Sequence, residues 1–161
     1  LKTMEYELCQ YLGFGNIIEK TYAEWQKHFG LGADVEMEAE HELKMEQEFG
    51  QTLITNFPEL TSPFWNMARN NDGNTAKKMD VILGGMETIG SAERSCDVDM
   101  MRDTFHSITD GAYSKLLFEL FGKDRVEAEL EKFLEFDFFQ RVGGGIGVTR
   151  MIPALEKINK V

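Results

Sequence analysis

The chain has 161 residues, of which 42% are hydrophobic and 28% are charged, and its formal net charge is −11. This is enough for one domain with a buried core, and the composition is that of a globular protein. No apolar run approaches the roughly 20 residues of a membrane span, and the first residues do not resemble a secretory leader. The lysines and arginines are scattered, so the acidic surface is expected to repel nucleic acid.

The two cysteines, Cys9 and Cys96, form no CxxC pair and no ligand cluster. Two free thiols in a reducing cytoplasm are therefore expected, although a disulfide is not excluded by the sequence. The predicted location is the cytoplasm.

The first third of the chain predicts three helices. Residues 4–12 place apolar side chains at helical spacing. Thr21 and Glu24 form the pattern of a capping box for a second helix that ends at Phe29. A third, very acidic helix is expected over residues 35–49, before a glycine.

The middle of the chain changes to strand-like composition. Strands are predicted over residues 51–57, 63–69, 78–83 and 86–91. The turn sequence NNDGN at 70–74 and the glycine pair at 84–85 indicate hairpins. Strands that follow one another through short turns favour an antiparallel arrangement.

The last third predicts helices at 97–108, 113–120 and 124–136, a glycine-rich strand at 142–148 and a helix at 149–159. Helices, then consecutive strands, then helices indicate an α+β fold in which helices flank an antiparallel sheet.

Three charged residues stand at equal intervals around the double-glycine turn: Asp80, Glu87 and Arg94 are seven residues apart. On adjacent antiparallel strands they could converge on one face. Carboxylates suit Mg²⁺ shared with substrate phosphates, and a guanidinium suits two-point binding of a carboxylate. The alternative is that they are ordinary surface charges of little energetic value.

The sequence GGGIGVTR at 143–150 is a second candidate. Glycines let a backbone approach a flat ring or a phosphate, and Arg150 could meet a triphosphate. The segment has neither GxxxxGK[ST] nor a complete GxGxxG. Its alternative interpretation is a tight packing site or a bulge.

The other candidates are best explained by structure. Phe64 and Trp65 are expected to pack in the core, and the acidic run at 36–48 is expected to form a solvated helix face. His41 within that run is not expected to be a ligand or a base. No Ser-His-Asp or Cys-His arrangement is indicated.

These segments together resemble the aspartyl- and asparaginyl-tRNA synthetase group of class II synthetases, from about Thr21 to Pro153. The resemblance is carried by TYAEW, EHELKMEQEFGQTLITNFP, SPFWNM, MDVILGGMETIGSAER and GGGIGVTR, the last being similar to class II motif 3. It implies a class II synthetase-like fold and the ATP-dependent conversion of aspartate or asparagine to an aminoacyl-adenylate.

The resemblance also implies roles for the charged residues. Asp80 and Glu87 would lie near ATP and hold its Mg²⁺, and Arg94 would bind the side chain of aspartate or asparagine. Arg150 would contact the triphosphate as a catalytic group together with Glu87. Catalysis would come from positioning and charge neutralisation, without a side-chain nucleophile.

The glycines of the same strand also receive a role from the resemblance. Gly145 and Gly147 would give ATP room.

The chain is expected to be one partial catalytic domain over residues 1–161, because motifs 1 and 2 of the family should lie upstream of Leu1. Such a fragment alone could be inactive. The resemblance implies a homodimer, and contact with tRNA only through a full-length parent.

Two departures from the family pattern leave other functions open. Thr149 stands where an acidic residue usually precedes the motif 3 arginine, and Arg141 and Val142 replace a Pro-His pair. In this respect VGGGIGVTR is closer to ammonia-dependent asparagine synthetase. A non-catalytic truncated paralogue is the third alternative.

Overall fold

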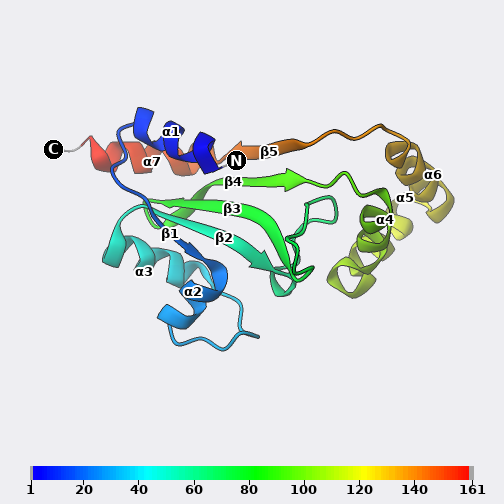
Figure 1. Ribbon diagram of the computed structural model, residues 1–161, viewed down its shortest axis with the longest axis horizontal. Helices are drawn as coiled ribbons and strands as arrows, with labels where there is room; N and C mark the ends of the chain where they lie inside the picture. The colour runs from blue at the N-terminus through cyan, green and yellow to red at the C-terminus, as the bar shows by residue number, and fades with distance from the viewer. Residues whose placement is uncertain (1, 160–161) are drawn as a thin grey trace.

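The structure is a computed structural model that describes residues 2–159. Its centre is a five-stranded sheet in the order β1-β2-β3-β4-β5 (Figure 1). The strands are β1 (Ile18–Thr21), β2 (Thr52–Pro58), β3 (Thr75–Leu83), β4 (Met86–Arg94) and β5 (Arg141–Ile146). The α-helices are α1 (Lys2–Tyr11), α2 (Tyr22–His28), α3 (Ala39–Phe49), α4 (Val98–Ser107), α5 (Ala112–Phe121), α6 (Lys123–Leu134) and α7 (Val148–Ile158). Two short 3-10 helices are η1 (Glu59–Thr61) and η2 (Ile108–Gly111).

The sheet is mostly antiparallel, as predicted. β2, β3, β4 and β5 pair in antiparallel fashion, while the short strand β1 runs parallel to β2. β1 was not predicted, because its four residues, IEKT, are largely polar and carry no strand-like alternation. The α+β architecture is therefore confirmed, with one parallel strand added at an edge.

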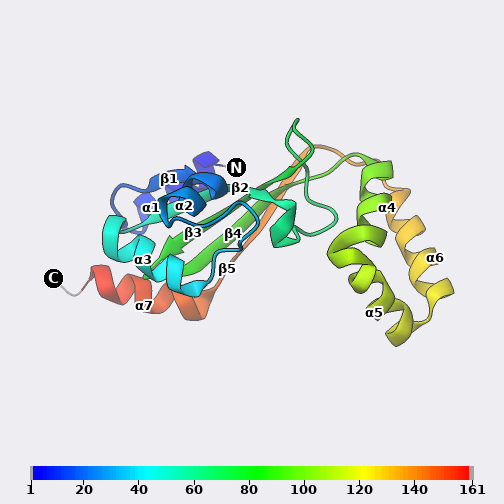
Figure 2. The same ribbon diagram turned by 90° about the horizontal axis from the view of Figure 1, so that it is seen from below.

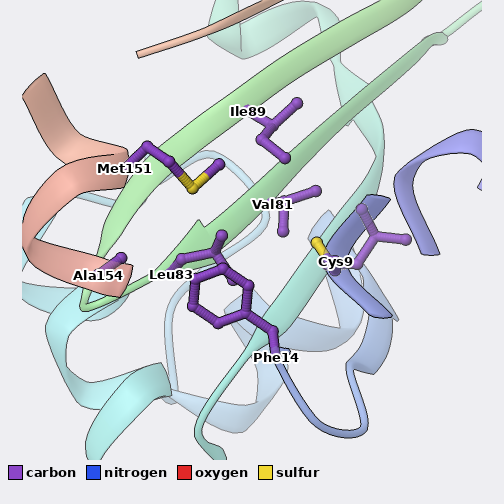
Figure 3. Close-up of a cluster of buried hydrophobic side chains, with 8 residues drawn as sticks. Cys9, Phe14, Val81, Leu83, Ile89, Met151 and Ala154 are labelled. Carbon is purple, nitrogen blue, oxygen red and sulfur yellow. The ribbon is translucent and has the colours of Figure 1, made fainter. Parts of the chain in front are cut away.

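One face of the sheet packs against the first and last helices, α1 and α7 (Figures 1 and 3). Figure 3 shows side chains from α1, the loop after it, strands β3 and β4, and α7 meeting in one cluster. The buried members are Cys9, Phe14, Leu53, Val81, Leu83, Ile89, Met151 and Ala154. Burial of this apolar surface fixes α7, and with it the end of β5, against the central strands.

The opposite face is covered in part by α2 and α3. Trp25 and Met45 are fully buried there against Ile54 and Ile82. The predicted capping box is confirmed, since Thr21 Oγ1 accepts from the Glu24 backbone N–H at 3.2 Å and the Glu24 carboxylate accepts from the Thr21 N–H at 2.8 Å. On this face α2 contacts β1 and β2, and α3 lies across β2, β3 and β4.

Helices α4, α5 and α6 form a separate bundle at the far end of the sheet (Figure 2). Trp65 joins this bundle to the sheet domain, because its ring packs edge-on against Phe105 at 5.5 Å and Phe133 at 5.6 Å. The expectation that Phe64 and Trp65 pack in the core is confirmed for Trp65 and wrong for Phe64, whose side chain is exposed.

The predicted strand at 63–69 is wrong. Only single bridges form there, between Met67 and Arg94 and between Arg69 and Ala76. The segment bends because Trp65 turns into the helical bundle and the Arg69 guanidinium bonds the Met67 and Pro63 carbonyl oxygens, at 2.7 and 3.2 Å.

The third helix begins four residues later than predicted, at Ala39. The chain before it is tied to α2 through backbone groups. Gln26 Nε2 donates to the Val35 carbonyl oxygen at 2.7 Å, and the Met37 N–H donates to the Tyr22 hydroxyl at 2.7 Å. These tertiary contacts outweigh the helical propensity of the segment.

The cysteines are both free, Cys9 buried and Cys96 exposed. Burial, followed by the nearby Glu5 carboxylate, raises the pKa of the Cys9 thiol to about 11. Across residues 2–159, none of the helices combines the length and the apolar character needed to cross a bilayer.

Candidate functional site

Asp80 and Glu87 lie together in one cavity on the face covered by α2 and α3. Asp80 is on β3 and Glu87 is at the start of β4, and both line a cavity of about 160 Å³. The remaining lining residues are Tyr22, Glu36, Met37, Glu42, Met45, Ile54, Phe57, Thr61 and Lys78. The sequence prediction that these two carboxylates converge agrees with their placement.

Their convergence depends on an irregularity and a glycine. The register between β3 and β4 shifts after Val81, so that Asp80 pairs with Gly90 while Ile82 pairs with Glu87. A Cβ atom added at Gly90 would lie 2.6 Å from Glu87 Oε1 and 3.4 Å from Asp80 Oδ1. Both oxygens therefore face the same point above Gly90, and a larger residue there would displace them.

Asp80 is buried beside one cation. Lys78 Nζ lies 2.5 Å from Asp80 Oδ2, and the same ammonium group sits 4.0 Å from the centre of the Phe57 ring. Burial raises the pKa of Asp80 to about 7, Glu87 and Glu42 act in the same direction, and Lys78 opposes them. The other oxygen, Oδ1, is buried and has no hydrogen-bond partner among residues 2–159.

The unpartnered Asp80 Oδ1 and the neighbouring Glu87 carboxylate suit a divalent cation. Mg²⁺ is commonly bound by one or two carboxylates together with substrate phosphates and water. Within residues 2–159 no cluster of three or more Asp, Glu, His or Cys residues is arranged to hold a metal by itself. The residues thus fit a Mg²⁺ ion that arrives with, and is shared by, a phosphate-bearing ligand.

Arg94 lies on the same face at the other end of β4. Its guanidinium passes over Gly143 of β5, where an added Cβ would lie 3.1 Å from Arg94 Nε. It donates to the Asn66 side-chain oxygen at 3.2 Å and to the Gly143 carbonyl oxygen at 3.4 Å. The guanidinium is half-buried and has no carboxylate partner among its hydrogen bonds in the described residues.

The side chains of Glu87 and Arg94 point toward each other along β4. Glu87 lies over Gly90, and Arg94 lies over Gly143, which pairs with Ala92. Gly90 and Ala92 are two residues apart, about 7 Å along a strand. The acidic cavity and the guanidinium thus flank a short stretch of β4 and β5 formed by Gly90 and Ala92 and their partners Gly145 and Gly143. Lys78 of β3 borders this stretch, because it pairs with Ala92.

Arg150 is in the first turn of α7 and is exposed. Its Nη1 donates to the Glu87 backbone oxygen at 2.7 Å, which brings the guanidinium to the rim of the acidic cavity. Gly147 precedes the helix, and its N–H donates to the Thr88 carbonyl oxygen at 2.8 Å. This bond fixes the start of α7 beside β4.

Gly144 and Gly145 of β5 differ in the space around them. A Cβ at Gly144 would lie 2.7 Å from Ser91 Cβ and 2.8 Å from the Gly90 oxygen, so this glycine is required for packing. A Cβ at Gly145 would meet no atom of the described residues within 4 Å. Tight packing therefore explains Gly144, while the space beside Gly145 is open.

Two residues of the site were missed by the sequence analysis. Lys78 is two residues from Asp80, and because alternate side chains of a strand point to the same face, the sequence could have placed both on one face. Glu42 Oε2 accepts from the Glu87 N–H at 2.8 Å, and burial raises the pKa of Glu42. Nothing in the acidic run separates Glu42 from its exposed neighbours, so the sequence carried no signal for it.

His41, in the same run, has a local structural role. It is buried, and its Nδ1 accepts from the Glu38 N–H at 3.0 Å at the beginning of α3.

The sequence model of the family described as tRNA synthetases class II (D, K and N) matches residues 8–161. The chain belongs to this family. An asparagine–tRNA ligase of Treponema denticola is 34% identical to this class II synthetase chain over 88 residues, which are 50% of this chain and 18% of that protein.

Solved structures of class II synthetases share the fold. Asparaginyl-tRNA synthetase from Pyrococcus horikoshii matches with a TM-score of 0.65 and 18% identity, covering 88% of this chain and 33% of that one. Aspartyl-tRNA synthetase from Entamoeba histolytica matches with a TM-score of 0.64 and 18% identity, covering 90% and 31%. Asparaginyl-tRNA synthetase from Entamoeba histolytica in complex with asparaginyl-adenylate matches with a TM-score of 0.66 and 14% identity, covering 98% and 37%. The class II synthetase chain therefore spans less than two-fifths of the length of each of these relatives.

Proposed function

We propose that this class II domain takes part in activating aspartate or asparagine with ATP to form an aminoacyl-adenylate. The observation that carries the proposal is the pair of facing charges on β4. Glu87 and Asp80 offer carboxylate oxygens above Gly90, and Arg94 approaches from the other end of the strand. A ligand with phosphates at one end and a side-chain carboxylate or amide at the other matches this arrangement.

Each residue has a role in the proposed reaction. Asp80 and Glu87 would hold Mg²⁺, Arg94 binds the amino acid side chain, and Arg150 neutralises charge on the triphosphate. The bound ion would neutralise phosphate charge. The amino acid carboxylate attacks the α-phosphate, the bond to pyrophosphate breaks, and the protein contributes orientation and a fixed electrostatic environment.

The proposal also covers the setting of the reaction. The T. denticola relative is named an asparagine–tRNA ligase, which favours tRNA over ammonia as the acceptor of the activated amino acid. The net charge of −11 makes this segment a poor surface for tRNA, so we place any tRNA contact in other parts of a full-length parent. We further propose a cytoplasmic homodimer.

ATP–pyrophosphate exchange tests the reaction directly. The chain and a full-length parent would each be assayed with aspartate, with asparagine and with neither. Exchange that depends on one amino acid is the expected result and names the substrate. Absence of exchange from the full-length parent with both amino acids would refute adenylation.

Replacing Glu87 with glutamine is expected to weaken ATP binding only when Mg²⁺ is present. The amide keeps the size of the side chain but is a poor ligand for a hard cation. We expect a loss of about tenfold, equivalent to about 1.4 kcal/mol, in the affinity for Mg²⁺–ATP. Isothermal titration with and without Mg²⁺ measures this.

The exposed α6 residue Glu129, changed to glutamine, is the control for that substitution. Equal affinities of Glu87→Gln and the unmodified chain, with and without Mg²⁺, would remove Glu87 from the metal site.

A further inference from the structure

Residue Glu87 is held by side chains from two other elements. Its backbone N–H donates to Glu42 Oε2 of α3 at 2.8 Å, and its backbone oxygen accepts from Arg150 Nη1 of α7 at 2.7 Å. The three residues are 45 and 63 positions apart in the chain, so folding alone brings them together. Glu87 therefore sits between an anion on one side and a cation on the other.

These two hydrogen bonds lie where the pairing of β4 is irregular. The register of β3 and β4 shifts next to Glu87, so regular strand pairing does not by itself determine the conformation there. Hydrogen bonds to both backbone groups restrict the φ and ψ angles of Glu87. Those angles aim its carboxylate over Gly90, toward Asp80 Oδ1.

The position of Glu42 is costly for a site that receives a triphosphate. Glu42 lines the acidic cavity together with Asp80, Glu87 and Glu36, and a further carboxylate there increases the repulsion of phosphate. Charge alone therefore argues against an acid at this position. A backbone N–H bound to a carboxylate is, in contrast, among the stronger hydrogen bonds in proteins.

We propose that Glu42 is a positioning residue, which holds the backbone of Glu87 so that the Glu87 carboxylate and the Arg150 guanidinium meet the same Mg²⁺–triphosphate. The inference rests on the proposed function, since it assigns a task within the same site. Glu42 itself need not touch the ligand, because its action passes through the Glu87 N–H.

The test compares three single variants of the chain. Glu42→Ala removes the acceptor, Glu42→Gln keeps an oxygen that can accept from the Glu87 N–H but removes the charge, and Glu40→Ala is the control. Glu40 is on the same helix and is exposed, and its ion pairs within the described part of the chain are with its neighbours Lys44 and His41. Mg²⁺–ATP affinity is measured by titration, and exchange of the Glu87 amide hydrogen is measured by NMR.

A positioning role predicts that the two Glu42 variants behave differently. Glu42→Ala should speed exchange of the Glu87 amide and weaken Mg²⁺–ATP binding about tenfold, equivalent to about 1.4 kcal/mol. In Glu42→Gln the exchange rate of the Glu87 amide and the Mg²⁺–ATP affinity should both stay close to those of the unmodified chain. Glu40→Ala should change neither quantity. If Glu42 acts only through its charge, both Glu42 variants would instead bind ATP more tightly, and the proposal would be wrong.

The same experiment separates this proposal from the proposed function. An unmodified chain that binds Mg²⁺–ATP, with unchanged affinity in Glu42→Ala, would refute the positioning role and leave the function standing. A chain and a full-length parent that both fail to bind Mg²⁺–ATP would refute the function, and the positioning role with it.

Discussion

Replacing Arg94 with alanine should weaken binding of aspartate or asparagine by about 2–5 kcal/mol, because the variant loses a charged contact in a partly desolvated site. ATP affinity should remain close to that of the unmodified protein. The physical reason is the separation of the two ends of the site, since the carboxylates of the cavity lie over Gly90 and the guanidinium lies over Gly143. Titration of each ligand alone measures both affinities.

Arg94→Lys distinguishes geometry from charge. Lysine keeps the positive charge but lacks the planar fork that binds two atoms at once, so most of the loss should persist. Arg125→Ala is a suitable control, because Arg125 forms an exposed pair with Glu129 on α6. A fall in ATP affinity with unchanged amino acid affinity would show that Arg94 has been assigned to the wrong ligand.

The stability of the chain should fall as the pH rises from about 5 to 8, chiefly because of Asp80. Burial raises the pKa of Asp80 from 3.8 to about 7, so between these values the folded chain keeps a proton that the unfolded chain has released. Stability decreases with pH wherever the folded state binds more protons. A shift of about three units corresponds to at most about 4 kcal/mol.

Chemical denaturation at pH 5 and pH 8 measures this slope. Asp80→Asn should flatten it and make the variant more stable than the unmodified chain at pH 8. His106 also has a raised pKa and contributes a slope of the same sign, which is present in both proteins and cancels in the difference. The pKa of Glu42 is raised too, and its slope has the same sign, but part of that slope changes with Asp80 because the two carboxylates repel each other. The exposed residue Asp103, changed to asparagine, is the control.

Protonation of Asp80 should also compete with Mg²⁺ binding. Mg²⁺ must displace the proton from Asp80, so its affinity in the presence of ATP should rise between pH 6 and pH 8. If the Mg²⁺ affinity changes with pH by the same amount in Asp80→Asn and in the unmodified chain, Asp80 is ionised in the folded protein throughout this range.

Local sequence patterns determined most of the secondary structure. The capping box at Thr21 and the double glycine at 84–85 act through contacts within a few residues, and both features lie where they were expected. Spacing also placed Asp80 and Glu87 on adjacent antiparallel strands, because strand alternation and a short turn are local properties. The family likewise followed from segments whose order is written in the chain.

Tertiary packing decided the rest. Residues 63–69 bend because Trp65 is buried against α4 and α6, and no period in the sequence reports where a partner helix will lie. Glu42 differs from Glu40 only in what folds against it, and Gly144 differs from Gly145 only in what lies opposite. The sequence alone therefore determined most of the elements and the family. Burial and long-range hydrogen bonds depend on residues far apart in the chain, so only the tertiary structure decided which acids and glycines build the site.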